Sequence, residues 1–262
     1  MRCGVSPLFS KEPMKSLAII PARYSSTRLE GKPLCLIAGH PMIEWVWRRS
    51  AAALGRAVVA TDDERIAEAV ERFGGEVVLT SHTHTSGTSR CIEALQKIEN
   101  ASGEKMEVVV NVQGDEPFVN GTYLHQLVEA FSDAAVDIAT LVRPFSAGED
   151  LKNPNWPKVV VGQTGCAIYF SRSVIPYERN AVHYPYLKHI GVYAFRAEML
   201  RSRLGKLTYS SLEQCEGLEQ LGWLYHGFAI QTVTVPDEGI SVDTPDDLLR
   251  AQQYASEHAL SL

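Results

Sequence analysis

Residues 17–34 read Leu-Ala-Ile-Ile-Pro-Ala-Arg-Tyr-Ser-Ser-Thr-Arg-Leu-Glu-Gly-Lys-Pro-Leu. The stretch begins with an apolar run, residues 17–20, which predicts a strand buried on both faces of a sheet. A proline ends the run and opens a loop that holds three cations, Arg23, Arg28 and Lys32. Cations and free backbone N–H groups directly behind a buried strand favour a polyphosphate site, because α/β proteins bind ligands at the carboxyl ends of their strands.

The loop lacks the usual glycine signatures of nucleotide sites. Lys32 follows Gly31, but no glycine lies five residues before Gly31, and Pro33 stands where a P-loop has Ser or Thr. The chain also contains no Gly-x-Gly-x-x-Gly. A nucleotide would therefore be held by side-chain cations, and the alternative interpretation of the loop is a solvated basic turn.

Composition limits the classes of protein to consider. The chain has 262 residues, 45% of them hydrophobic, which suits one large α/β domain or two small ones. A net charge of −6 argues against a nucleic-acid partner, and no apolar run approaches the roughly 18 residues of a membrane span. The five cysteines are scattered without a Cys-x-x-Cys pair, as expected for a cytoplasmic protein with no zinc site or disulfide framework.

Strand and helix patterns alternate over residues 15–145, which predicts an α/β fold with a doubly wound, mainly parallel sheet. Strands are expected at residues 17–20, 57–60, 76–79, 108–112 and 137–142, and helices at residues 41–54, 65–73, 91–99 and 122–131.

The second half of the chain has a different pattern. Gly, Asn and Pro accumulate over residues 145–157, and residues 145–228 are expected to form a smaller appended lobe of strands and helices. A strand at residues 230–235 and a final helix then return to the main domain. Residues 14–262 are thus expected to be a single domain, and residues 1–13 a disordered extension without the apolar core of a signal peptide.

Two aspartates stand where a metal site belongs. Asp115 follows a buried strand and a glycine, and a carboxylate there suits Mg²⁺ that is shared with nucleotide phosphates. The alternative is a turn aspartate that binds its own backbone. Asp243 also follows a strand and opens a helix, although Asp-Thr-Pro-Asp is equally a common helix cap. The pair at residues 62–63 is expected to cap a helix, and His82-x-His84 to lie in an exposed loop, because no third ligand follows.

A series of motifs occurs in one order and resembles the 3-deoxy-manno-octulosonate (Kdo) cytidylyltransferase family from about residue 16 to 255. The motifs are Pro-Ala-Arg-Tyr-Ser-Ser-Thr-Arg-Leu-x-Gly-Lys-Pro-Leu at 21–34, Ala-Thr-Asp-Asp at 60–63, Ser-Gly-Thr-x-Arg at 86–90, Asn-Val-Gln-Gly-Asp-Glu-Pro at 111–117, Ile-Tyr-Phe-Ser-Arg at 168–172, Lys-His-Ile-Gly-Val-Tyr-Ala-Phe-Arg at 188–196, Leu-Glu-Gln-Leu at 218–221 and Val-Asp-Thr-Pro at 242–245.

The resemblance implies a Rossmann-like, GT-A-like nucleotidyltransferase fold and the reaction CTP + Kdo → CMP-Kdo + diphosphate in lipopolysaccharide synthesis. It implies in-line attack of the sugar 2-hydroxyl on the α-phosphorus with Mg²⁺, and a homodimer formed through the second lobe. The implied catalytic residues are Arg23, Lys32, Asp115 and Asp243, with Asp115 and Asp243 as metal ligands. The residues implied for CTP are Pro21, Ala22, Arg23, Ser25, Arg28, Lys32, Ser86, Gly87, Arg90 and Gln113, and those for Kdo are His189, Tyr193, Glu219 and Gln220.

Two positions depart from the family pattern. Ser89 stands where the family usually has Asp or Glu, and Gly222 stands where an arginine usually ends the Glu-Gln-Leu-Arg motif. Two alternative functions remain at this point: a related enzyme for another sugar acid, such as sialic acid, and a nucleotide-binding regulatory protein without turnover. A glycosyltransferase is less favoured, because the chain has no Asp-x-Asp metal motif.

Overall fold

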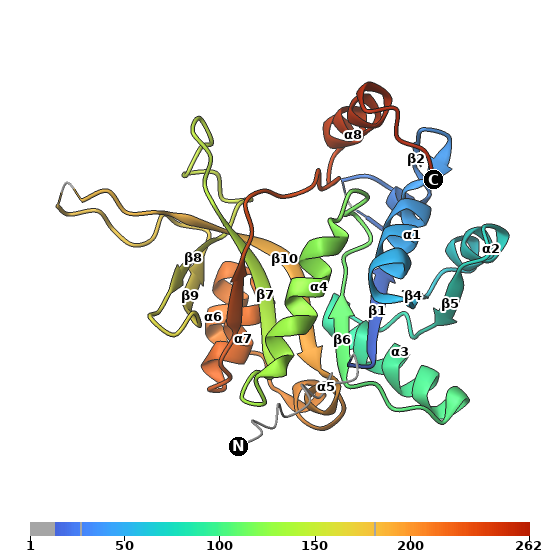
Figure 1. Ribbon diagram of the computed structural model, residues 1–262, viewed down its shortest axis with the longest axis horizontal. Coiled ribbons are helices and arrows are strands. Elements are labelled where there is room, and N and C mark those ends of the chain that lie inside the picture. The colour runs from blue at the N-terminus through green and yellow to red at the C-terminus, as the bar shows by residue number, and fades with distance from the viewer. Residues whose placement is uncertain (1–13, 27, 181) are drawn as a thin grey trace, which may run out of the picture.

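The computed structural model describes residues 14–262 except Thr27 and Ala181, so the extension expected over residues 1–13 lies outside the described residues. One twisted sheet runs through the molecule with helices on both faces (Figure 1). The strands are β1 (Ser16–Ala22), β2 (Leu36–Ile37), β3 (His40–Pro41), β4 (Ala57–Thr61), β5 (Glu76–Leu79), β6 (Val108–Asn111), β7 (Ile138–Pro144), β8 (Lys158–Val161), β9 (Ala167–Ser171), β10 (Leu187–Arg196) and β11 (Gln231–Thr234). The α-helices are α1 (Met42–Leu54), α2 (Glu64–Arg72), α3 (Gly87–Ser102), α4 (Gly121–Glu129), α5 (Ala197–Ser202), α6 (Ser211–Glu216), α7 (Glu219–Tyr225) and α8 (Pro245–Glu257), and short 3₁₀ turns are η1 (Lys32–Leu34), η2 (Ala130–Ser132) and η3 (Leu204–Lys206).

The strand order is β11-β7-β10-β6-β1-β4-β5, with β8 and β9 attached beside β10. Strand β1 runs parallel to β4 and β6, whereas β10 is antiparallel to both of its neighbours, β6 and β7. The expected α/β fold with a mainly parallel sheet is confirmed. Residues 145–228, expected as an appended lobe, supply β10 to the middle of this sheet and are therefore continuous with it.

The sheet is buried on both faces because helices cover each side. Along β1, Leu17 and Ile19 face a layer that contains α3, α5 and α7, and Ala18 and Ile20 face a layer that contains α1, α2 and α4. All four side chains are fully buried. The continuous apolar run that opens the sequence is what a parallel strand between two helical layers requires.

A third, smaller core attaches the last helix. Trp45 of α1 is fully buried, donates its indole N–H to the carbonyl oxygen of Ile37 at 2.9 Å, and packs with Phe118 and Ala251. Helix α8 is thereby fixed against α1 at the upper edge of Figure 1. No helix in the described part of the chain has the length and apolar character needed to cross a membrane.

Candidate active site

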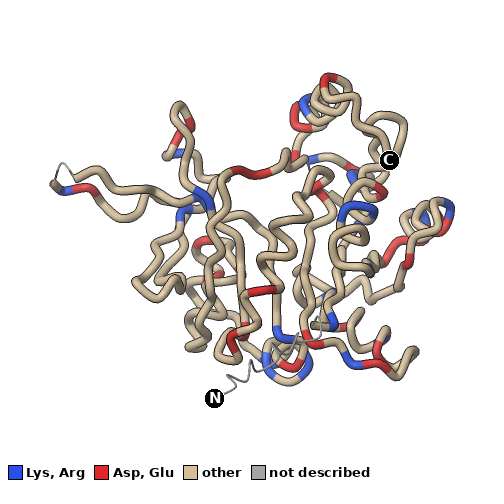
Figure 2. Tube along the Cα trace, in the orientation of Figure 1, with Lys and Arg blue, Asp and Glu red and all other residues tan. Residues whose placement is uncertain are grey.

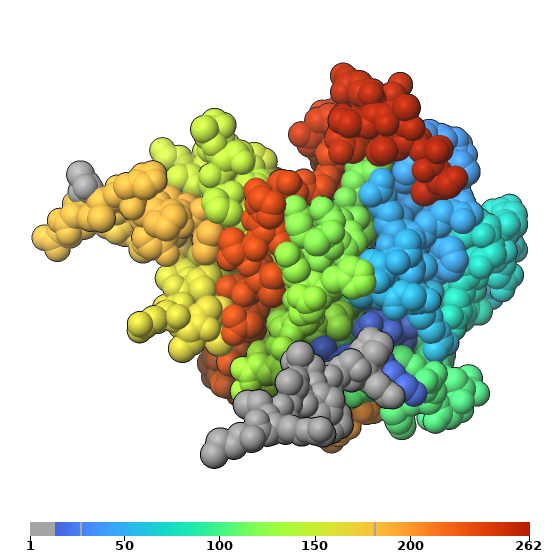
Figure 3. All heavy atoms as spheres, in the orientation of Figure 1, coloured from blue at the N-terminus to red at the C-terminus, as the bar shows by residue number. Residues whose placement is uncertain are grey.

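The carboxyl ends of the parallel strands β1, β4 and β6 share one edge of the sheet. The loop after β1 carries Lys32, the loop after β6 carries Asp115, and the segment between β11 and α8 carries Asp243. Figure 3 shows a notch in the surface at this edge, between α8 and the projecting connection from β7 to β8. Residues from three distant parts of the sequence therefore meet near this edge of the sheet.

Lys32 lies between the two aspartates. Its Nζ is 2.6 Å from Oδ2 of Asp115 and 3.1 Å from Oδ1 of Asp243. Arg28 adds a second cation, with Nη2 3.0 Å from the same oxygen of Asp243. Lys32 thus joins Asp115 and Asp243, three of the four residues that the resemblance implies for catalysis, while the fourth, Arg23, is exposed on the loop after β1.

The pKa of Lys32 lies above its ordinary value of 10.5. Burial alone would lower it, but the charge and hydrogen bond of Asp115, followed by those of Asp243, outweigh burial. Lys32 is therefore a charged ammonium at neutral pH. The two carboxylates already attract a cation to the space between them.

Asp243 is not the cap of the last helix. Thr244 holds that position, because its hydroxyl accepts the N–H of Asp247 while Asp247 accepts the N–H of Thr244. This capping box satisfies the helix end without Asp243. The carboxylate of Asp243 is left to face Lys32, which removes the main alternative to a functional role.

A backbone hydrogen bond holds the two aspartates together: the N–H of Val242 donates to the carbonyl oxygen of Asp115 at 2.9 Å. Gly239, three residues earlier, passes close to the backbone behind Asp115. A Cβ on Gly239 would lie 2.8 Å from the carbonyl oxygen of Phe118, a distance that real Cβ atoms do not adopt. The segment before α8 can therefore reach Asp115 only with glycine at this position.

The same segment is tied to the sheet by charge. Glu238 pairs with Arg143 of β7 at 2.7 Å and also contacts the ammonium of Lys188 of β10. Figure 2 shows acidic positions along the segment between β11 and α8, facing basic positions where β7 ends. The sequence did not indicate a role for Glu238, because the Asp-Glu-Gly stretch that contains it shows no helical or strand periodicity. Its partners, Lys188 and Arg143, lie 50 and 95 residues away in the sequence.

The pair Asp115 and Asp243 suits a magnesium ion that is shared with phosphates. Mg²⁺ takes one or two protein carboxylates and fills its remaining positions with phosphate oxygens and water. Among residues 14–262, Thr27 and Ala181 excepted, no three His, Cys, Asp or Glu side chains gather into a complete metal cage.

The start of α3 approaches the ends of β1 and β6. The predicted helix began at Cys91, whereas α3 begins at Gly87, capped by the hydroxyl of Ser86, which accepts the N–H of Ser89 at 3.1 Å. A Cβ on Gly87 would be 3.3 Å from Pro21 and 3.5 Å from Oε1 of Gln113. Pro21, Gly87 and Gln113 thus lie against one another, while Arg23 and Ser25 are exposed on the loop after β1 and Ala22 is buried.

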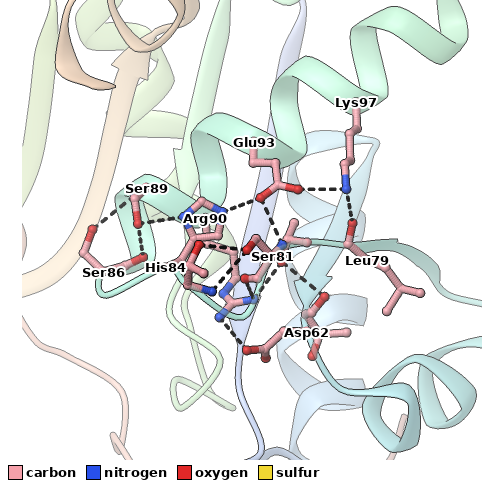
Figure 4. A network of polar contacts seen from close by, with 12 residues as sticks. Asp62, Leu79, Ser81, His84, Ser86, Ser89, Arg90, Glu93 and Lys97 are labelled. Atoms are coloured by element: carbon pink, nitrogen blue, oxygen red, sulfur yellow. Dashed lines mark hydrogen bonds and ion pairs between the residues drawn. The ribbon is translucent and has the colours of Figure 1, made fainter. Parts of the chain in front are cut away.

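Arg90 is the most enclosed of the cations singled out by sequence. Its guanidinium donates to Thr80 at 2.7 Å and pairs with Asp62 at 3.2 Å, so it joins α3 to the loops after β4 and β5 (Figure 4). His84 beside it contacts Ser89 and Glu93. Asp62 is engaged in this ion pair, and Asp63 is the cap of α2 as expected.

A second group of polar residues lies on the other side of α3. Ser86 and Thr88 donate their hydroxyls to the two carboxylate oxygens of Glu219, each at 2.9 Å. Burial raises the pKa of Glu219 above its ordinary value, and these two hydrogen bonds partly oppose that rise. Ser86 therefore connects Glu219 to the first turn of α3.

Two buried polar atoms in this group have no protein partner among the described residues: the hydroxyl of Tyr193 and Nε2 of Gln220. Tyr193 packs edge-on against Trp223 and lies 5.3 Å, ring centre to ring centre, from His189. Buried polar groups are nearly always hydrogen-bonded. Two buried donors without a protein partner, close to Glu219, are suited to bind a ligand that carries hydroxyl or carboxylate groups.

His189 is neutral. Burial lowers the pKa of its imidazole to about 3. Thr140 donates its hydroxyl to the carbonyl oxygen of Val192 at 2.9 Å, so the 3.1 Å contact between Thr140 and Nε2 of His189 assigns the ring proton to Nε2. Nδ1 then remains an acceptor.

In His189→Gln the free energy of unfolding is expected to fall less on acidification than in the wild type. Between pH 6.5 and about 3 the unfolded chain binds a proton at this histidine and the folded chain does not, so the free energy of unfolding falls as pH decreases. The slope from one such group is at most about 1.4 kcal/mol per pH unit. Urea unfolding at pH 6.5 and 4.5 should therefore show a loss that is smaller by about 2 kcal/mol in His189→Gln than in the wild type.

The control is His82→Gln, at an exposed histidine, which should keep the wild-type acid dependence. If His189→Gln loses as much stability on acidification as the wild type, the imidazole is not buried in its neutral form.

The two family departures lie beside this second group. Ser89 bonds to the carbonyl oxygen of Ser86 at 2.9 Å, within the first turn of α3. A Cβ on Gly222 would lie 2.5 Å from Oε2 of Glu213, so the carboxylate of Glu213 fills the space over Gly222. Both positions line a cavity of about 260 Å³ that borders Glu219. Ser89 and Gly222 thus alter the surroundings of Glu219 and leave the contacts of Lys32 unchanged.

Comparisons with known proteins extend over nearly the whole chain. A family model described as cytidylyltransferase matches residues 17–232. A 3-deoxy-manno-octulosonate cytidylyltransferase of Phocaeicola vulgatus is 48% identical over 253 residues, covering 93% of this chain and 98% of that protein. The protein of the same name from Fusobacterium nucleatum is 43% identical over 251 residues, covering 95% of this chain and 100% of its own.

Solved structures give the same result. A structure of CMP:2-keto-3-deoxy-manno-octonic acid synthetase complexed with CTP has a TM-score of 0.87 and 40% identity, and covers 93% of this chain and 99% of its own. A 4-diphosphocytidyl-2C-methyl-D-erythritol synthase from Anaerococcus prevotii has a TM-score of 0.60 at 13% identity, a likeness of fold alone.

Proposed function

Because the chain belongs to the 3-deoxy-manno-octulosonate cytidylyltransferase family, we propose that it catalyses CTP + Kdo → CMP-Kdo + diphosphate. The observation that carries the proposal is the contact of Lys32 with Asp115 and Asp243 at the carboxyl edge of the sheet. A cation between two carboxylates, beside a basic loop and a helix N-terminus, is suited to phosphoryl chemistry.

In this reaction the 2-hydroxyl of Kdo gives up its proton to the solvent, its oxygen forms a bond to the α-phosphorus, and the bond from that phosphorus to diphosphate breaks in line. Asp115 and Asp243 would hold Mg²⁺, and the bound ion would supply charge neutralisation at the reacting phosphate and a lower pKa for the attacking hydroxyl. Lys32, Arg28 and Arg23 bind the triphosphate and stabilise charge on the departing diphosphate. We assign Pro21, Ala22, Ser25, Ser86, Gly87, Arg90 and Gln113 to the nucleotide side, with Arg90 acting through the loops that it joins.

The orphaned polar atoms support a sugar-acid site beside Glu219. The hydroxyl of Tyr193 and Nε2 of Gln220 are buried donors that can serve the carboxylate or hydroxyls of Kdo. Glu219 and the bare Nδ1 of His189 can accept from sugar hydroxyls. Because Ser86 contacts Glu219 directly, the acceptor would lie next to the nucleotide.

We further propose that the protein is a homodimer and acts in the cytoplasm, where CTP is available, in lipopolysaccharide synthesis. Two exposed apolar side chains in the second half of the chain support a dimer surface. Ile168 of β9 is 62% exposed, and Tyr177, in the connection from β9 to β10, is 87% exposed. Large apolar side chains that are this exposed are candidates for burial in an association surface. Sedimentation velocity of the wild type and of Ile168→Asp tests this, with conversion to monomer expected for the variant.

Release of diphosphate from CTP and Mg²⁺ tests the reaction and its acceptor together. Release with Kdo and none with sialic acid is expected. Release with sialic acid alone would support the related sugar-acid enzyme, and CTP binding without release for either acceptor would support a regulatory protein.

Tyr193→Phe tests the sugar site. The KM for Kdo is expected to rise about tenfold, the equivalent of one lost hydrogen bond, while the KM for CTP stays within twofold. The free energy of unfolding should stay equal or rise by about 1 kcal/mol, because the variant removes a buried hydroxyl that lacks a partner. Steady-state kinetics and urea unfolding measure both. An unchanged KM for Kdo would show that the hydroxyl does not contact the sugar.

A further inference from the structure

The ammonium of Lys32 occupies the space that the proposed function gives to a divalent metal. Its Nζ contacts Oδ2 of Asp115 and Oδ1 of Asp243 at hydrogen-bonding distances of 2.6 and 3.1 Å. The ammonium lies between one oxygen of each carboxylate, so a divalent ion held between the same two carboxylates would be placed against its positive charge. Lys32 and the metal therefore compete for one place.

We propose that Lys32 excludes divalent cations from the site until a nucleoside triphosphate draws its ammonium away, so that metal and nucleotide bind together. This inference rests on the proposed function and adds an order of assembly to it. Lys32 acts here as a residue that controls metal binding, in addition to its role at the phosphates.

Charge balance supports this order. Asp115 and Asp243 contribute two negative charges, and Lys32 and Arg28 contribute two positive charges at contact distance. A divalent cation that entered while both side chains stayed would meet a neutral cluster and two nearby cations. A triphosphate instead brings several negative charges, which provide Lys32 with new partners and leave the carboxylates free for the metal.

The local backbone lets the side chain move while the loop stays in place. Gly31 adopts a left-handed conformation with φ of 64°, and its N–H donates to the carbonyl oxygen of Tyr24 at 3.0 Å. Pro33 on the other side is buried. The four-carbon stem of Lys32 starts from this fixed turn, and a compact ammonium on a flexible stem can exchange partners without a backbone change.

The experiment measures binding of Mn²⁺ to the full-length protein without Kdo, by the loss of the free Mn²⁺ electron paramagnetic resonance signal. In nucleotide-free protein, Lys32→Gln is expected to bind Mn²⁺ at least about tenfold more tightly than the wild type, because the carboxylates lose their internal cation. Lys32→Met, of similar length and also uncharged, should behave alike and provides a second variant. Lys206→Gln, at an exposed lysine of η3, should match the wild type.

The double variant Lys32→Gln, Asp115→Asn tests whether the tighter Mn²⁺ binding of Lys32→Gln occurs at Asp115. It should bind Mn²⁺ no more tightly than the wild type. Water proton relaxation then distinguishes Mn²⁺–CTP on the protein from Mn²⁺–CTP in solution, and the wild type is expected to form this ternary complex. Circular dichroism and thermal unfolding confirm that each variant is folded.

The outcomes separate the inference from the proposed function. Wild-type protein that binds nucleotide-free Mn²⁺ as tightly as Lys32→Gln overturns the inference, and so does a ternary complex in the wild type with no gain in either Lys32 variant. Absence of Mn²⁺ binding to every protein, with CTP as well as without it, overturns the metal site itself, while diphosphate release tests the reaction separately.

Discussion

Asp115→Asn is expected to lower kcat for diphosphate release by about 1000-fold, with the fold intact. A metal ion at a phosphoryl centre supplies several kcal/mol of charge stabilisation, and each 1.36 kcal/mol corresponds to a factor of ten in rate. Asparagine has the size of aspartate but not its charge, and Lys32 keeps its contact with Asp243. Stopped-flow or coupled detection of diphosphate with saturating CTP, Kdo and Mg²⁺ measures the loss.

Asp246→Asn is the matched control, because Asp246 lies in the first turn of α8, close to Asp243 in sequence, and is exposed. Its turnover should stay within twofold of the wild type. Turnover of Asp115→Asn within tenfold of the wild type would remove Asp115 from the metal site. A far-ultraviolet circular dichroism spectrum distinguishes lost chemistry from lost structure.

Gly239→Ala is expected to lower kcat/KM by about 100-fold and the free energy of unfolding by about 1–3 kcal/mol. The new Cβ would lie 2.8 Å from the carbonyl oxygen of Phe118, and a backbone atom cannot rotate away as a side chain can. The segment must therefore shift, and it carries Asp243 four residues later. Displacement of a reacting group by about 1 Å is enough to cost two orders of magnitude.

Gly162→Ala separates this effect from the general cost of changing a glycine. A Cβ on Gly162 would meet its nearest atoms at 3.5 Å, an ordinary contact, and the residue lies between β8 and β9. Its stability and turnover should stay close to those of the wild type. If Gly239→Ala loses stability while its kcat/KM is unchanged, the segment does not position Asp243.

The sequence was sufficient where local patterns decide structure. The apolar runs of β1, β4 and β6 and the helical spacing of α1 and α2 predicted the alternating half of the sheet. Pairing over long distances could not be predicted. In the sequence, strand β10 seems to belong to a separate lobe, yet in the structure it lies between β6 and β7 and is antiparallel to both. Its place in the sheet could not be predicted, because it depends on pairing with residues that are far away in the sequence.

Short elements also escaped prediction. Strands β2 and β3 have two residues each and show no period, and their hairpin depends on positive φ angles at Ala38 and Gly39. The start of α3 was expected too late, because Gly87 is a poor helix former and its role is to allow close packing against Pro21.

For the candidate site, sequence identified the acidic and basic groups but not their contacts. It left Asp243 as either ligand or cap, and the position of Thr244 shows only that Asp243 is not the cap. Nothing in the sequence indicated that Lys32 would bridge both aspartates. Arg143 and Glu238 were missed because each is an ordinary charged residue until the fold brings them together.

The hydrogen bond from Val242 to Asp115 has a consequence for protein synthesis. A ribosome delivers Asp115 before Asp243, and 128 positions separate the two residues (243 − 115). Domains tend to fold from the amino terminus during translation, so β1, β4 and β6 can pair while the second carboxylate is still inside the ribosome. The nascent protein can thus form most of its sheet before Asp243 is available, and the proposed metal site is complete only after Asp243 has emerged from the ribosome.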